Sequence, residues 1–115
     1  MKWPILLFIM TFSYVSIAND CTMDISYSNF PSEILEDLSL KYNLVDINAR
    51  FIATGKMQCL ERYCIYTLTI LENNEGHKVV NNTIEGRGED DFFALKSADE
   101  EAIKDTIRQL ESCLE

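Results

Sequence analysis

The chain has 115 residues, of which 19 are acidic and 10 are Lys or Arg, so its formal net charge is −9. This acidity argues against a nucleic-acid-binding protein, because phosphate binding needs clustered basic side chains that displace counterions. The same sign of charge disfavours attraction to an anionic membrane surface.

The first 18 residues have the three parts of a secretory signal peptide. Lys2 precedes an uncharged apolar run, which closes on the small residues Ser16 and Ala18. The run is shorter than the roughly 20 apolar residues that a membrane-spanning helix needs. We therefore expect residues 1–18 to be a signal peptide and residues 19–115 to form a single α+β domain. The mature domain is expected to be secreted or periplasmic, with no membrane insertion after cleavage.

The next expected element is a helix over residues 32–43. A helix-start signal precedes it at residues 29–32. Four apolar residues then recur at helical spacing: Ile34, Leu35, Leu38 and Tyr42. This spacing gives the helix one apolar face.

The period then changes to two, which predicts strands at residues 50–57, 64–71 and 78–85. The middle run alternates most clearly, because every second residue from 66 to 70 is large and apolar. Residues 73–76 have the composition of a tight turn between the second and third strands.

An acidic loop with two glycines is expected at residues 85–91. After it, Ser97 and Glu100 have the spacing of a capping box at the start of a second helix. An apolar stripe follows at intervals of four, three and four residues: Ile103, Ile107, Leu110 and Leu114. This pattern puts Cys113 on the last turn of the helix.

Four cysteines remain in the mature chain, and an even number in an exported domain is typical of disulfides. Cys59 and Cys64 flank a four-residue connection between two predicted strands. Opposed residues of a hairpin lie close enough to be bonded there. Cys21 and Cys113 then pair by elimination. A zinc site is the alternative, although the spacing lacks paired Cys-x-x-Cys clusters.

The predicted order is therefore α-β-β-β-α. Since each helix has one apolar face, we expect both helices to cover one face of a three-stranded antiparallel sheet, in an α+β fold stapled by disulfides. The other face would be open, and its residues are the expected interaction surface: Arg50, Ile52, Thr54, Lys56, Ile65, Thr67 and Thr69.

The α-β-β-β-α order, with Gly86 and Gly88 before Ser97 and a C-terminal helix, is similar to the double-stranded-RNA-binding-domain fold. The resemblance implies that topology but not RNA binding. The family's phosphate-binding lysines would fall at residues 98–101, which are Ala-Asp-Glu-Glu here. Residues 68–110 also resemble strand-turn-strand-helix units of bacterial periplasmic and outer-membrane assembly proteins, which implies a bacterial source.

Few residues are suited to catalysis, and we expect no enzyme activity, no cofactor and no metal. His77 is the only histidine and is expected to be a solvated turn residue. The carboxylates of residues 85–91 could bind calcium, but that ion needs roughly six to eight oxygens in a defined order, and no such loop pattern is present. Phe92 and Phe93 are expected to pack into the core or beneath a lid. Asn81 begins a glycosylation acceptor sequence that matters only in a eukaryotic source.

These observations predict a small exported, non-catalytic binding domain of a bacterium that engages a protein partner through its open sheet face. The alternative is a secreted effector or inhibitor of a host or competitor enzyme, with residues 85–91 as the reaching element. A small hydrolase is a third class.

Overall fold

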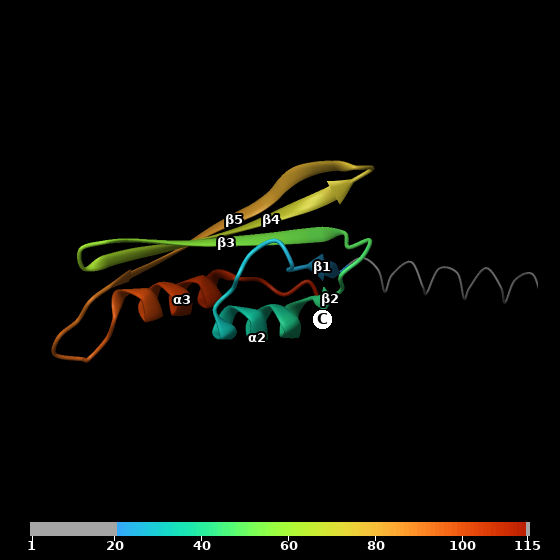
Figure 1. Ribbon diagram of the computed structural model, residues 1–115. Helices are drawn as coiled ribbons and strands as arrows, with labels where there is room; N and C mark the ends of the chain where they lie inside the picture. The colour runs from blue at the N-terminus through green and yellow to red at the C-terminus, as the bar shows by residue number, and fades with distance from the viewer. Residues whose placement is uncertain (1–20, 115) are drawn as a thin grey trace, which may run out of the picture.

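The computed structural model describes residues 21–114, and the expected signal peptide at residues 1–18 lies outside the described residues. The described residues form two helices and one five-stranded mixed sheet (Figure 1). The elements in chain order are β1 (Thr22–Asp24), α2 (Ser32–Lys41), β2 (Asn43–Leu44), β3 (Phe51–Leu60), β4 (Tyr63–Asn74), β5 (His77–Glu89) and α3 (Ala98–Gln109). The predicted α+β class is confirmed.

The sheet has the strand order β2-β1-β3-β4-β5, which corrects the expected three-stranded antiparallel sheet. β3, β4 and β5 are the long antiparallel strands that the sequence predicts. β1 is parallel to both of its neighbours, β2 and β3. Because β1 and β2 have only three and two residues, they leave no alternating pattern that would reveal them in the sequence.

Both helices lie on the same face of the sheet (Figure 1). The alternation in β4 directs every second side chain into the core between the layers, as its pattern predicts. The largest fully buried apolar side chains come from β1, α2 and β4: Met23, Ile34, Leu38, Tyr66, Leu68 and Ile70. The turn predicted at residues 73–76 is confined to residues 75–76, because Asn73 and Asn74 are paired in β4. Both turn residues have positive φ, as two-residue hairpin turns of type I′ require.

α3 packs on the sheet mainly through small side chains, and the expected apolar stripe is confirmed as a buried face only at Leu110. Four residues of α3 and its C-terminal end are buried: Ala98, Ala102, Thr106 and Leu110. Ile103 and Ile107 are only partly buried. The cause lies in β5, where a Cβ atom at Gly88 would collide with the first turn of the helix. Residues 85–89 are therefore strand and not the expected acidic loop.

α3 also begins without the expected capping box. Ser97 occupies the N-cap position, but its side chain makes no capping hydrogen bond. Asp90 replaces it, because its Oδ1 accepts a hydrogen bond from the backbone N of Ala98 at 2.7 Å. A carboxylate at this end of a helix also interacts favourably with the helix dipole.

The chain after α3 is extended, so Cys113 is not on the last turn of a helix. The backbone N atoms of Cys113 and Leu114 both donate hydrogen bonds to the carbonyl of Lys41, at 3.1 and 3.0 Å. The Nζ of Lys41 in turn donates to the carbonyl of Leu110 at 2.7 Å. Lys41 therefore fixes the C-terminal segment against the end of α2.

The two disulfides have the predicted pairing. Cys21–Cys113 joins the start of β1 to the C-terminal segment, with Cα atoms 5.7 Å apart. Cys59–Cys64 joins two directly opposed residues of the β3–β4 hairpin, with Cα atoms 4.1 Å apart. The first bond therefore constrains the whole domain, and the second constrains one hairpin.

Replacing both Cys21 and Cys113 by Ser should lower the free energy of unfolding more than replacing both Cys59 and Cys64. The bonds span 92 and 5 residues. In the loop-entropy description this difference favours the long-range bond by about 2–3 kcal/mol. Urea unfolding of the two double variants measures it, and equal losses would contradict the explanation.

Candidate interaction surface

The sheet face opposite the helices carries most of the residues that the sequence assigns to an interaction surface. The register of β3 and β4 places Thr54 opposite Thr69 and Lys56 opposite Thr67. Ile65 lies two residues before Thr67 and on the same face of β4. All five side chains are half-buried or exposed. They therefore form a continuous, threonine-rich surface.

Ile52 differs from this expectation, whereas Arg50 is exposed but already engaged within the molecule. The guanidinium of Arg50 pairs with Glu72 at 2.9 Å and lies 5.1 Å from the ring centroid of Phe51. Ile52 is buried and lines a pocket that Tyr27 also borders. The remaining face is rich in threonine, a residue under-represented among the anchors that dominate protein interfaces. It stays a predicted contact surface with few anchors.

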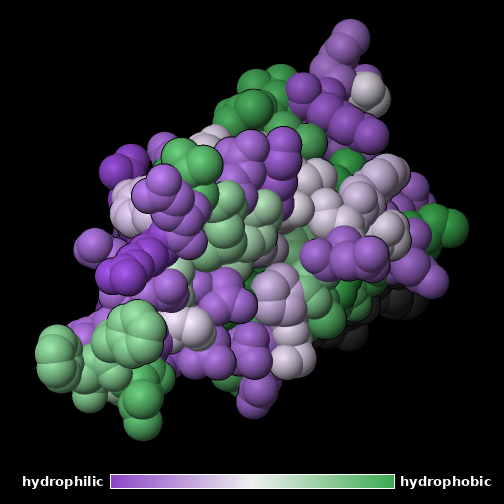
Figure 2. All heavy atoms as spheres, turned by 60° about the vertical axis from the view of Figure 1, so that its left-hand side comes forward, coloured by the Kyte–Doolittle hydropathy of each residue, from purple (hydrophilic) through white to green (hydrophobic). Residues whose placement is uncertain are grey.

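A group of exposed apolar side chains lies at one end of the molecule. Three of its four members lie on the loop between β5 and α3, which forms the apolar protrusion at the lower left of Figure 2. Phe92, Phe93 and Leu95 in this loop are 77%, 102% and 91% exposed, and Leu60 at the end of β3 is 79% exposed. We call these four residues the apolar tip.

The prediction that Phe92 and Phe93 are packed against the core or a lid is therefore wrong. β5 extends four residues beyond the expected end at residue 85, so the chain passes the end of the sheet before the two rings occur. The signal available in the sequence was the short apolar run at residues 92–95, bounded by Asp91 and Lys96 and lacking helical or strand periodicity. In protein design, an exposed run of apolar residues is avoided unless it has a function.

Hydrogen bonds hold the loop of the apolar tip in one conformation. Asp91 and Lys96 exchange two backbone hydrogen bonds, of 2.9 and 3.0 Å. The Oδ1 of Asp91 accepts two more, from the backbone N atoms of Phe93 at 3.1 Å and Ala94 at 3.3 Å. Leu95 has a φ of 54°, in the left-handed region, which costs a leucine about 1 kcal/mol. The loop thus presents a leucine at a position where the backbone favours Gly or Asn.

The β3–β4 turn is attached to the same loop. The backbone N of Asp90 donates to the carbonyl of Arg62 at 2.9 Å. The guanidinium of Arg62 lies 5.6 Å from the ring centroid of Phe92. Since the Cys59–Cys64 disulfide closes the hairpin below this turn, it fixes the part of the tip that carries Leu60.

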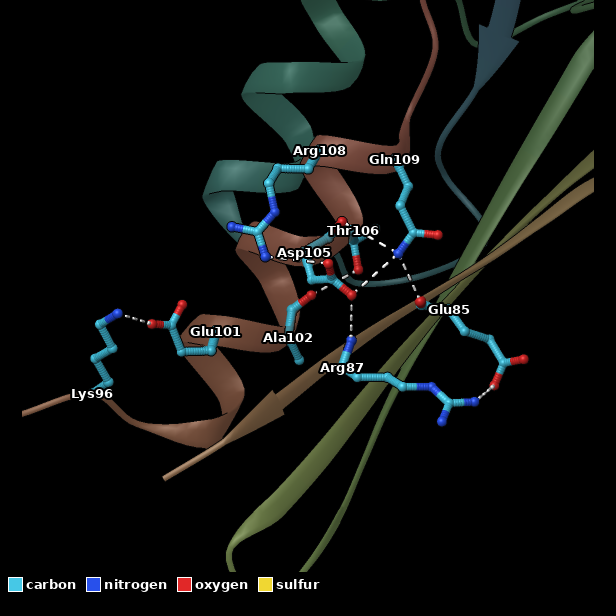
Figure 3. A network of polar contacts seen from close by, with 9 residues as sticks. All are labelled: Glu85, Arg87, Lys96, Glu101, Ala102, Asp105, Thr106, Arg108 and Gln109. Atoms are coloured by element: carbon cyan, nitrogen blue, oxygen red, sulfur yellow. Dashed lines mark hydrogen bonds and ion pairs between the residues drawn. The ribbon is translucent and has the colours of Figure 1, made fainter. Parts of the chain in front are cut away.

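Polar side chains of α3 fasten the helix to the outer edge of β5 (Figure 3). The Oδ2 of Asp105 accepts a hydrogen bond from the backbone N of Arg87 at 2.9 Å. The Nε2 of Gln109 donates to the carbonyl of Glu85 at 2.8 Å. These contacts satisfy backbone groups that an edge strand otherwise leaves open. They also fix the helix whose first residue follows the apolar tip.

The bond from the Arg87 backbone is the main reason why the pKa of Asp105 lies below its ordinary value, and a bond from Arg108 adds to it. A hydrogen bond donated to a carboxylate favours the charged form. The ionised Asp105 therefore stabilises the contact between α3 and β5.

The residues considered for chemistry are not assembled into a metal site. Within residues 21–114, no group of three or more His, Cys, Asp or Glu side chains is placed to hold a metal ion. His77 is exposed at the start of β5. Asp90 and Asp91 are exposed, and their carboxylates accept hydrogen bonds from the start of α3 and from the loop of the apolar tip. The helices described here include none that is long and apolar enough to span a membrane.

We compared the chain with protein-family models, with curated proteins and with solved structures, and none of the three comparisons finds a match.

Leu95→Asn should raise the free energy of unfolding by about 0.5–1 kcal/mol, because Asn tolerates the left-handed conformation better than Leu. Urea unfolding measures the change. Leu60→Asn is the matched control, since it removes an equally exposed leucine from the apolar tip at a residue without positive φ, and should stay within about 0.5 kcal/mol. A loss of stability for Leu95→Asn would show that this side chain stabilises the fold.

Asp105→Asn should make stability less sensitive to acid. A carboxyl whose folded pKa is lowered contributes stability above its unfolded pKa, and loses it as pH falls below about 4. The slope of unfolding free energy against pH should therefore be shallower for Asp105→Asn in this acid range. Glu75→Gln, in the distant β4–β5 turn, is the control that removes one carboxylate. Equal slopes for wild type and Asp105→Asn would contradict the role of Asp105.

Proposed function

We propose that this protein is a small exported, non-catalytic domain that binds a protein partner through its apolar tip. The observation that supports the proposal most directly is the exposure of Phe92, Phe93 and Leu95 on a loop held by hydrogen bonds. Covering apolar surface contributes roughly 25 cal/mol per Å². Buried aromatic anchors supply much of the binding free energy at protein interfaces. A partner that covers the tip would recover this free energy.

The fixed conformation of the loop favours binding as well. A loop that is ordered before binding loses little conformational entropy when a partner covers it. The bridge between Asp91 and Lys96 and the bonds to the Asp91 carboxylate provide this order. The left-handed Leu95 also supports a functional role, because local backbone strain is concentrated at such sites.

Export is supported by the two disulfides. Disulfides persist in the oxidising compartments outside the cytosol, including the bacterial periplasm and the extracellular medium. We place the domain in one of these two compartments.

Inhibition of an enzyme is a second candidate function. The observation that favours it is the protruding shape of the tip (Figure 2), which suits insertion into a cleft. The reaching element would be residues 91–96, because residues 85–89 belong to β5.

Phe93→Ser should abolish recovery of the partner from the native compartment and leave the free energy of unfolding within about 0.5 kcal/mol of wild type. The side chain contributes to binding and not to the core, because it is fully exposed. Quantitative mass spectrometry of pull-downs measures the recovery. Val79→Ser, at an exposed apolar residue of β5, is the control.

Equal recovery by wild type and Phe93→Ser would contradict binding through the apolar tip. If the recovered partner is an enzyme whose activity falls on adding wild type but not Phe93→Ser, the inhibitor function is favoured over a plain binding domain.

A further inference from the structure

The surroundings of the apolar tip carry much of the negative charge of the chain. Residues 60–63 and 89–101 contain seven acidic and two basic residues, a net charge of −5 out of the formal −9. The seven are Glu61, Glu89, Asp90, Asp91, Asp99, Glu100 and Glu101. A concentration of one sign creates a field that attracts the opposite charge.

The two basic residues of these two segments, Arg62 and Lys96, are already engaged within the molecule. The Nζ of Lys96 lies 3.4 Å from a carboxylate oxygen of Glu101. The guanidinium of Arg62 lies over the ring of Phe92. The apolar tip is therefore surrounded by carboxylates whose charge is only partly compensated.

A hollow of about 290 Å³ lies between the tip and the start of α3. Phe92 and Leu95 form its apolar sides, and Asp90, Asp91, Lys96 and Ser97 also line it. The ammonium of Lys96 is paired with Glu101, which lies outside the hollow. Lys and Arg side chains have an apolar stem and a charged end. Such a side chain fits this hollow with its stem against Phe92 and Leu95 and its charge beside the carboxylates.

We infer that the partner's binding site is an apolar pocket bordered by Lys or Arg side chains. The inference rests on the proposed function, because it assigns the partner of the same apolar tip. Phe93 enters the apolar pocket, and the surrounding carboxylates meet the basic border. Complementary charges of this kind steer association, and salt screens them over a Debye length of about 10 Å at 0.1 M. The same carboxylates repel an anionic membrane.

The test uses the full chain with the photo-crosslinking residue p-benzoyl-phenylalanine in place of Phe93, produced in the source cells. The same residue in place of Val79 is the control. An extract of the native compartment is then irradiated at low and at high salt, and it should give a protein adduct specific to position 93. Its yield should fall about tenfold between 50 and 300 mM NaCl, because screening removes the steering.

Charge variants of the crosslinking protein test the carboxylates directly. The variant Glu61→Gln/Glu89→Gln/Glu100→Gln removes three charges near the tip but leaves the hydrogen bonds of Asp90 and Asp91 intact. Its adduct yield should fall about tenfold at 50 mM NaCl and change little at 300 mM. The control Glu36→Gln/Glu75→Gln/Glu111→Gln removes the same charge away from the tip, including one turn residue with positive φ, and should leave the yield unchanged.

The outcomes separate the two proposals. An adduct that depends on position 93 but not on salt or on the tip carboxylates would overturn the basic pocket and leave the binding function intact. Equal adduct yields at positions 93 and 79 would overturn both. Vesicles of phosphatidylcholine, with and without phosphatidylglycerol, are the lipid probe. Co-sedimentation that Phe93→Ser abolishes would replace the protein partner by a lipid surface and overturn the inference.

Discussion

The close approach of the α3 backbone to two glycines of β5 is the constraint on which the rest of this domain depends. A Cβ atom at Gly86 or Gly88 would collide with atoms of α3. The helix and the strand therefore meet with no β5 side chain between them at these two residues. Small residues of α3 therefore face the sheet, and Ile103 and Ile107 turn toward α2. The same approach brings Asp105 within reach of the β5 edge. It also fixes where α3 begins, and hence the C-terminal end of the loop that carries the apolar tip.

The apolar tip costs the fold stability, and local interactions offset that cost. The left-handed conformation of Leu95 lowers stability, and the exposed rings add almost nothing to it, because they are as exposed in the folded chain as in the unfolded one. The carboxylates of Asp90 and Asp91 compensate by accepting hydrogen bonds from the start of α3 and from the loop itself. The Cys59–Cys64 bond closes a hairpin already held by its strand ladder. We infer that its contribution is local order in the turn that carries Leu60.

Features that depend on local sequence could be predicted, and features that depend on tertiary contact could not. Periodicity predicted both helices and the three long strands, and cysteine spacing predicted both disulfides. Glycines and acidic residues at 85–89 resemble a loop until the helix that packs on them is in place. The isoleucine stripe of α3 was misassigned for the same reason. Phe92 and Phe93 were assigned to packing because large rings are usually buried, although no element within residues 21–114 covers them.

The negative charge around the apolar tip also opposes self-association through this exposed apolar group. Two copies that met tip to tip would bring two regions of net charge −5 together. Their repulsion opposes the apolar attraction, as separated like charges do at other surfaces. A partner with a basic border experiences the reverse, because the same carboxylates attract it while the rings are covered. We therefore infer that one charge distribution both limits self-association and selects the partner, which a purely apolar tip could not do.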